Sequence, residues 1–208
     1  MKLYLSSYRL GNKESFLKEW AKKHDNRVLI IINAQDMYLD NEDREIRNMN
    51  KCEDLIRVGF VPTILDLRKY FNNENKLRED IKGYHAFYVI GGNTFILRRS
   101  MKLSGFDNYL KEIVNMPDYL YIGYSAGICV LAPSLHGIDL EDEPDIDPYN
   151  YGKIIWDGLG FLEYTPIPHY GSLYSPKAYD TVSYMKEHNI KYKTLRDGEV
   201  IITDIKKA

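Results

Sequence analysis

The sequence predicts one doubly wound α/β domain that spans residues 1–208. Short apolar runs alternate along the chain with longer amphipathic stretches, which is the pattern of strands that alternate with helices. Several of the short runs are apolar almost throughout, as in a parallel sheet that is covered on both faces. A length of 208 residues favours a single domain, and a hydrophobic content of 44% supplies a substantial core.

The first part of the chain holds five expected strands. Their sequences are KLYLSS (2–7), RVLIIINA (27–34), TILDL (63–67), AFYVIGG (86–92) and YLYIGY (119–124). Between the strands, charged and apolar residues interleave at three- and four-residue spacing, as in EDLIRVGF (53–60), which is typical of amphipathic helices. The expected helices cover roughly residues 13–23, 41–58, 73–82, 94–102 and 105–115.

The alternation is looser in the second part of the chain. The segment IDLEDEPDIDPYNYG (138–152) is acidic and holds two prolines, so we expect an ordered loop there. TPIPHY (165–170) is a short strand or the end of one. Residues 175–188 predict a helix with Ser175 as its N-cap and Pro176 at its first position.

The last segment, KYKTLRDGEVIITDI (191–205), predicts two strands. Asp197 and Gly198 lie between them, and this dipeptide is a strong signal for a two-residue hairpin turn. We therefore expect the two strands to pair with each other.

Composition excludes several classes of function. A net charge of −2 and a pI near 6.2 give no overall basic surface for nucleic acid or anionic lipid. The longest apolar runs, such as VLIIINA (28–34), are strand-sized and too short to cross a bilayer, and the N-terminal MKLYLSSYRLGNK lacks the apolar core of a signal peptide. The two cysteines, Cys52 and Cys129, have no metal-like spacing, so we expect a reducing cytoplasm and no disulfide.

Ser125 is the strongest candidate for a catalytic residue. It lies in Gly123-Tyr124-Ser125-Ala126-Gly127, which follows an expected strand and opens an expected helix. In this context Gly-x-Ser-x-Gly places a nucleophilic serine on a sharp turn at the end of the strand. The alternative is a glycine-bounded turn in which the hydroxyl only caps the helix.

A second glycine turn strengthens the case for a nucleophile. YVIGGNTFILRR (88–99) also runs from strand through glycines to helix, with Thr94 able to cap the helix. Loops at the carboxyl ends of parallel strands converge at one edge of a sheet. A backbone N–H of Gly91 or Gly92 could therefore join that of Ala126 in an oxyanion hole.

The base is expected among the five histidines, and His169 is favoured over His136. His169 lies in TPIPHYG (165–171), where two prolines stiffen the chain at a strand end. A catalytic imidazole benefits from being held in one orientation. The acid is harder to place, because DLEDEPD (139–145) offers several carboxylates, and a charged loop is usually just solvated.

Three motifs together resemble a known family. VIGGNTF (89–95), GYSAG (123–127) and WDGLGFLEYTPIPHY (156–170), in this order and spacing, are similar to peptidase family S51, the group of dipeptidase E and cyanophycinase. The resemblance covers about residues 27 to 205. It implies a flavodoxin-like, mostly parallel sheet with helices on both faces, as in class I glutamine amidotransferases.

The resemblance also implies a serine peptidase that cleaves small peptides through an acyl-enzyme. The nucleophile falls on Ser125, the histidine on His169 and the acid on Asp142, although Glu141 and Glu143 flank that position. The site residues expected to hold substrate are Gly92 and Ala126, through their backbone amides, and Asn93. No cofactor or metal is needed, and neither a nucleic acid nor a membrane is expected as a partner of this monomer or homodimer.

One departure from the family concerns specificity. The segment GSLYSPKAYDTVSY after His169 holds no arginine that could meet an acidic substrate side chain. The remaining cations near the site are Arg98, Arg99 and Lys177, and we expect them to lie elsewhere, so that a preference for N-terminal Asp is weak or absent. Two alternatives stay open: a glutaminase-type amidotransferase, which would need cysteine at the turn, and a catalytically silent binding protein.

Overall fold

The computed structural model describes residues 1–38, 42–173 and 175–205. Within these ranges the central sheet has six strands in the order β3-β2-β4-β5-β1-β8. Neighbouring strands are parallel, except that β8 runs antiparallel to β1. The bounds are Lys2–Ser6 (β1), Arg27–Ile31 (β2), Val61–Leu65 (β3), Ala86–Val89 (β4), Leu120–Tyr124 (β5) and Val200–Asp204 (β8). The mostly parallel α/β sheet is confirmed.

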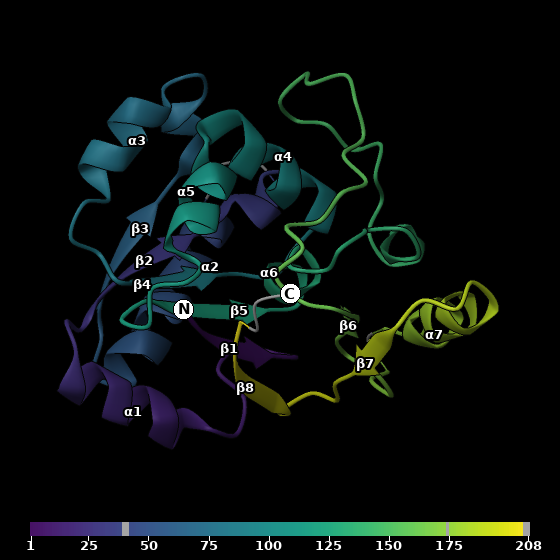
Figure 1. The fold of residues 1–208 in the computed structure, drawn as a ribbon, viewed down its shortest axis with the longest axis horizontal. Helices are drawn as coiled ribbons and strands as arrows, with labels where there is room; N and C mark the ends of the chain where they lie inside the picture. The colour runs from purple at the N-terminus through teal and green to yellow at the C-terminus, as the bar shows by residue number, and fades with distance from the viewer. Residues whose placement is uncertain (39–41, 174, 206–208) are drawn as a thin grey trace.

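Helices cover the two faces of this sheet. Their bounds are Glu14–Lys23 (α1), Glu42–Arg57 (α2), Glu74–Asp80 (α3), Thr94–Ser104 (α4), Phe106–Ile113 (α5) and Ala126–Cys129 (α6). A further helix, Ala178–Glu187 (α7), lies away from this sheet and has a small apolar cluster of its own. Figure 1 shows α3, α4 and α5 on one side of the sheet and α1 on the other, while α2 packs beside β3. None of these described helices is both long enough and apolar enough to cross a membrane.

The centre of the sheet is the most buried part of the fold. Every residue of β4 and β5 is buried, as their continuous apolar sequences predict, whereas the edge strand β3 is largely exposed. The carboxyl ends of β4, β5 and β1 lie side by side, because Val89 pairs with Gly123 and Ser6 with Tyr124. The loops that follow these three strands therefore meet at one edge.

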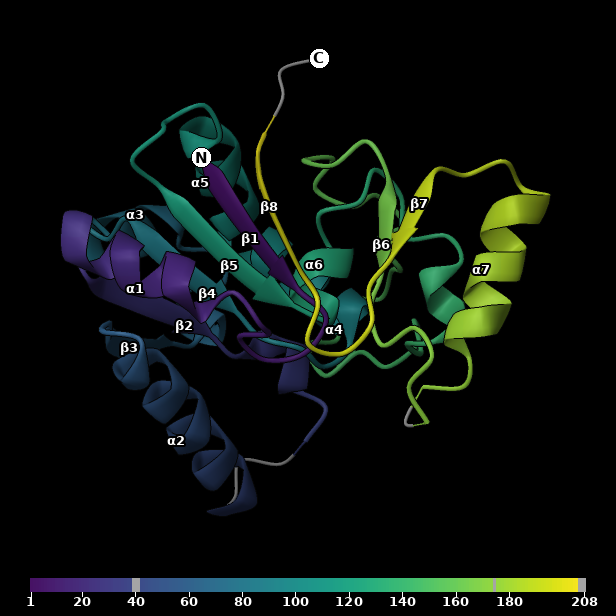
Figure 2. The same ribbon diagram turned by 90° about the horizontal axis from the view of Figure 1, so that it is seen from below.

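The expected hairpin at the end of the chain is not formed. Strand β7 (Tyr192–Thr194) pairs in parallel with β6 (Thr165–Ile167) in a separate two-stranded sheet. Strand β8 instead pairs with β1, on the side of β1 away from β5. Asp197 and Gly198 lie in the connection between the two sheets, which Figure 2 shows beside one another with α7 on the outer side. The amides of Ser7 and Asn12 donate to the carbonyls of Glu199 and Gly198, which ties this connection to the loop after β1.

Candidate active site

Ser125 lies on a strained turn between β5 and α6. Its backbone has φ 51° and ψ −121°, a conformation that residues with a side chain rarely adopt. The turn needs small neighbours, because a Cβ on Gly127 would lie 2.2 Å from the Val89 carbonyl oxygen. The expected strand, sharp turn and helix are all present, and the turn leaves the Ser125 side chain half-buried at the edge of the sheet.

His169 is brought to Ser125 by the turn after β6. Its Nε2 lies 3.0 Å from the Ser125 Oγ, and its backbone amide donates to the Ser7 Oγ at 2.8 Å. The competing histidine, His136, is exposed and stacks on Trp156 with the ring centroids 4.3 Å apart. Of the two histidines considered from the sequence, His169 is thus the one that the fold places at the serine.

The carboxylate beside His169 belongs to Asp197. Its Oδ1 lies 2.7 Å from the His169 Nδ1 and also accepts from the Ser7 Oγ at 2.9 Å. Desolvation raises the pKa of Asp197, but hydrogen bonds from His169 and Ser7 outweigh it, so the net effect lowers the pKa and keeps the carboxylate ionised. Sequence reasoning missed this residue, because an Asp-Gly pair between two strands is typical of a hairpin turn.

Asp142 does not contact the imidazole as the sequence predicted, so this pairing is corrected. Its Oδ2 accepts hydrogen bonds from the backbone amide and the hydroxyl of Thr94, at 2.8 and 2.6 Å. The first turn of α4 offers free amides and a partial positive charge, which hold a loop carboxylate there. Burial raises the pKa of Asp142 to about 6, even though the Thr94 hydrogen bonds lower it.

The two flanking carboxylates do not take the place beside His169 either. Glu141 accepts from the hydroxyls of Ser175 and Thr181, at 2.6 and 3.4 Å. Ser175 is therefore not the expected N-cap, and α7 begins three residues later at Ala178. The backbone carbonyl of Glu143 accepts from Asn93.

The glycine loop after β4 places a backbone amide near Ser125. Gly92 has φ 152°, and a Cβ on it would lie 2.2 Å from the carbonyl oxygen of Ala34, so only glycine fits. Neither the Gly92 nor the Ala126 amide donates to another backbone group of the described residues. Gly92 and Ser125 line one hollow at this end of the sheet, and Ala126 and Ser125 line a second.

Asn93 has a structural role instead of the expected place in the substrate site. Its side chain is 3% exposed and caps α4, with Oδ1 accepting from the amides of Phe95 and Ile96. Its Nδ2 donates to the Glu143 carbonyl at 2.9 Å. These contacts use both the oxygen and the nitrogen of the Asn93 side-chain amide. The sequence had suggested Thr94 as the cap of this helix, but the Thr94 hydroxyl donates to Asp142.

The three candidate cations do not line the site. The Arg98 guanidinium forms a buried ion pair with Asp107 at 3.0 Å, and its Nε donates to a backbone carbonyl. Arg99 is 1% exposed and donates to the backbone carbonyls of Pro144, Ile146 and Lys153. Lys177 is exposed just before α7.

Cys129 does not occupy the sharp turn at which an amidotransferase would need its cysteine, because Ser125 stands there. It lies at the end of α6 and is 4% exposed, with its Sγ 3.6 Å from the Pro166 carbonyl oxygen. Burial raises the pKa of this thiol well above its usual value, so the reactive thiolate is suppressed.

Known proteins share both the fold and the family of this chain. The family model of peptidase family S51 matches residues 9–208, so the chain belongs to peptidase family S51. A crystal structure of a Listeria monocytogenes protein assigned as a peptidase E has a TM-score of 0.74 at 21% identity and covers 99% of this chain and 98% of that one. A peptidase from an acI-B1 actinobacterium has a TM-score of 0.67 at 16% identity, covering 97% and 82%. These two likenesses confirm the flavodoxin-like fold.

The matching curated sequences cover a smaller share of this chain. An uncharacterized peptidase of Listeria innocua is 29% identical over 55% of this chain and 53% of its own length, and one of Listeria monocytogenes is 33% identical over 41% and 40%. The chain thus matches about half of the length of these relatives, or less. A Drosophila melanogaster protein named probable alpha-aspartyl dipeptidase is 26% identical over 82% of this chain and 79% of its own length.

Proposed function

We propose that this protein is a serine peptidase that hydrolyses small peptides through a Ser125–His169–Asp197 triad and an acyl-enzyme. The observation that carries the proposal is the continuous chain of contacts from the Ser125 Oγ through both nitrogens of His169 to the Asp197 carboxylate. Nucleophile, base and orienting acid stand in this relation in serine hydrolases on unrelated folds. Membership of a peptidase family supports the same reaction.

In the proposed reaction, His169 acts as general base and then as general acid. Its Nε2 removes the proton of the Ser125 hydroxyl as the oxygen attacks the peptide carbonyl carbon, and it passes that proton to the leaving amine. Asp197 at Nδ1 holds the required tautomer and stabilises the imidazolium while it is charged. Water, activated by the same imidazole, then hydrolyses the ester on Ser125.

The oxyanion of each tetrahedral intermediate is stabilised by the amides of Gly92 and Ala126. One such donor is worth roughly 3 kcal/mol of transition-state stabilisation in other serine hydrolases. The glycine loop packs closely on Ala34 and the serine turn on Val89, and this packing supports the assignment of the two donors.

The test compares wild type with Ser125→Ala, His169→Ala and His136→Ala on a panel of dipeptides. We expect Ser125→Ala to abolish hydrolysis and His169→Ala to lower kcat by about 10³-fold or more. His136→Ala is the matched control and should be near wild type, because its ring only stacks on Trp156. Loss of activity in His136→Ala with retention in His169→Ala would refute the assignment, and an inactive wild type with an unreactive Ser125 would favour a silent binding protein.

A further inference from the structure

Ser7 joins two members of the proposed triad through one buried hydroxyl. Its Oγ lies 2.8 Å from the backbone nitrogen of His169 and 2.9 Å from the Oδ1 of Asp197. An amide can only donate and an ionised carboxylate can only accept, so the hydroxyl accepts from His169 and donates to Asp197. Ser7 is 0% exposed, so water does not compete for either bond. The single proton of this hydroxyl is thereby committed to Asp197.

Ser7 belongs to the same sheet as the nucleophile. Strand β1 pairs in parallel with β5, and the pairing ends one residue before Ser7 and one residue before Ser125. The two serines therefore leave the central sheet at the same level of its carboxyl edge. His169 and Asp197 instead follow β6 and β7, the strands of the second sheet. The Ser7 hydroxyl thus ties these two residues to the strand beside the nucleophile.

The backbone of His169 needs such a contact. Its φ is 57°, in the left-handed region that residues with a side chain seldom adopt. A conformation of this kind persists only where neighbouring groups hold it. Ser7 accepts from the His169 amide, and the Ser172 amide donates to the His169 carbonyl at 2.9 Å. Because the imidazole leaves from the same Cα, loss of the Ser7 contact would let Nε2 turn away from the Ser125 Oγ.

Ser7 also acts on the carboxylate. Desolvation raises the pKa of the Asp197 carboxyl, but hydrogen bonds from His169, Ser7 and Ser172 outweigh it and lower the pKa. Two serines therefore help to keep this carboxylate ionised. The His169 amide has one proton, and Ser7 accepts it. Ser7 is thus the serine that links the carboxylate to the backbone amide of the base.

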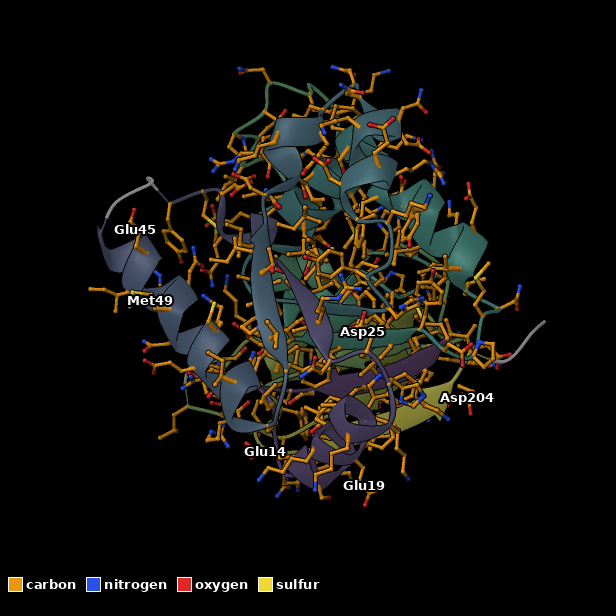
Figure 3. The ribbon with its side chains drawn as sticks, turned by 90° about the vertical axis from the view of Figure 1, so that its left-hand side faces the viewer. Glu14, Glu19, Asp25, Glu45, Met49 and Asp204 are labelled. Atoms are coloured by element: carbon orange, nitrogen blue, oxygen red, sulfur yellow. The ribbon has the colours of Figure 1, made fainter. Side chains whose placement is uncertain are left out.

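The segment that carries Ser7 is itself anchored to the body of the protein. Two residues later, the Nε of Arg9 donates to Asp54 of α2 at 2.6 Å. Arg57 binds the same Asp54 and also Glu14, the first residue of α1. Figure 3 shows Glu14 at the place where α1 and α2 approach each other. Ser7 is therefore a fixed point for the two triad residues that it binds.

Resting on the proposed function, we propose that Ser7 is a positioning residue for the reaction. Its hydroxyl holds the His169 imidazole between the Ser125 Oγ and the Asp197 carboxylate, and it does so without touching the reacting atoms. Loss of this hydroxyl should lower kcat, which depends on the direction of the imidazole, and leave KM nearly unchanged. A role in packing alone would instead lower the melting temperature and leave kcat as it is.

The first measurement is steady-state hydrolysis of Ala-Leu by the wild type, Ser7→Ala and Ser7→Cys, with melting curves to confirm folding. We expect Ser7→Ala to lower kcat by about 10- to 100-fold, because a small displacement of a catalytic group costs up to about 100-fold. KM should stay within about twofold of the wild-type value. Ser7→Cys fills nearly the same space but its sulfur is a weak donor and acceptor, so kcat should fall to a similar extent.

Ser6→Ala is the matched control for these variants. Ser6 is the neighbouring residue and is equally buried, and its Oγ donates to the Tyr8 carbonyl at 3.1 Å instead of binding a member of the triad. Its kcat should stay within about twofold of the wild-type value.

The second measurement is the rate at which a fluorophosphonate modifies Ser125, which needs no peptide substrate. Ser7→Ala should slow this reaction about tenfold in the otherwise wild-type protein. In the His169→Ala background it should change the rate by less than about twofold, because Ser7 acts through the imidazole that is then absent.

Three results would overturn this inference and leave the proposed peptidase intact. They are a kcat of Ser7→Ala within about threefold of wild type, recovery of the wild-type kcat in Ser7→Cys, and equal slowing of the fluorophosphonate reaction with and without His169. A wild-type protein that hydrolyses no peptide, but whose Ser125 is modified, would remove the proposed peptidase. The fluorophosphonate rates would then still decide the role of Ser7.

Discussion

Replacing Asp197 by Asn tests whether the acid of the triad is Asp197, as proposed from the structure, or Asp142, as expected from the sequence. The variant keeps the size of the side chain but removes the charge that stabilises the His169 imidazolium. Two unit charges 4 Å apart attract by about 1 kcal/mol in water and about 4 kcal/mol at an effective dielectric constant of 20. The His169 and Asp197 side chains are 23% and 38% exposed, so their environment lies between these limits.

The expected loss in kcat follows from that interval. About 1–4 kcal/mol corresponds to roughly 5- to 1000-fold, and we expect a loss near 100-fold in Asp197→Asn. Asp142→Asn should instead leave kcat within a few-fold, because the Asp142 carboxylate binds Thr94 and not His169. The assay is steady-state hydrolysis of Ala-Leu, with melting curves to confirm folding. A kcat near wild type in Asp197→Asn, together with a 100-fold loss in Asp142→Asn, would refute the reasoning.

Three further predictions concern stability. Ser125→Gly relieves the strain at φ 51° and should raise Tm by a few degrees, equivalent to about 1 kcal/mol, while abolishing hydrolysis; an unchanged or lower Tm in calorimetry would contradict this. Burial raises the pKa of the Asp142 carboxyl from 3.8 to about 6, so the folded protein holds this proton more tightly than the unfolded chain does. The free energy of unfolding should therefore fall as pH rises through this interval, by at most about 3 kcal/mol. Urea unfolding of Asp142→Asn should therefore show a smaller fall between pH 4 and pH 6.5 than wild type, and an identical fall would show that Asp142 does not cause it. Arg98→Met leaves the buried Asp107 carboxylate unpaired and should destabilise the fold by about 3 kcal/mol or more, without changing the ratio of kcat/KM for Asp-Leu and Ala-Leu; a changed ratio would place Arg98 in the substrate site.

Local sequence could predict the parts of the site that depend on local geometry. Ser125 was predictable because its turn brings Gly127 so close to Val89 that only glycine fits there. This local need is visible in the sequence as the Gly-x-Ser-x-Gly pattern. His169 was predictable because prolines at a strand end hold the chain in one direction. The complete burial of β4 and β5 was predictable from their continuous apolar sequences, because a strand that is covered on both faces has no polar side.

The acid depended on tertiary pairing, which no short window contains. Asp197 reaches His169 because β7 pairs with β6 while β8 pairs with β1, so the expected hairpin turn becomes a connection between two sheets. Asp142 is drawn to the first turn of α4, a segment 48 residues away in the chain. The position of Asp197 depends on which strand edge is open to β7 and β8, and the position of Asp142 depends on the open N-terminus of α4.

The most direct test of the central claim is to map the residue that a fluorophosphonate modifies. Mass spectrometry of the reacted protein should show a single adduct on Ser125, formed at least 100-fold more slowly in His169→Ala, because the serine hydroxyl is a poor nucleophile without its base. An adduct on another residue, or a folded wild-type protein whose Ser125 reacts no faster than in His169→Ala, would contradict the account.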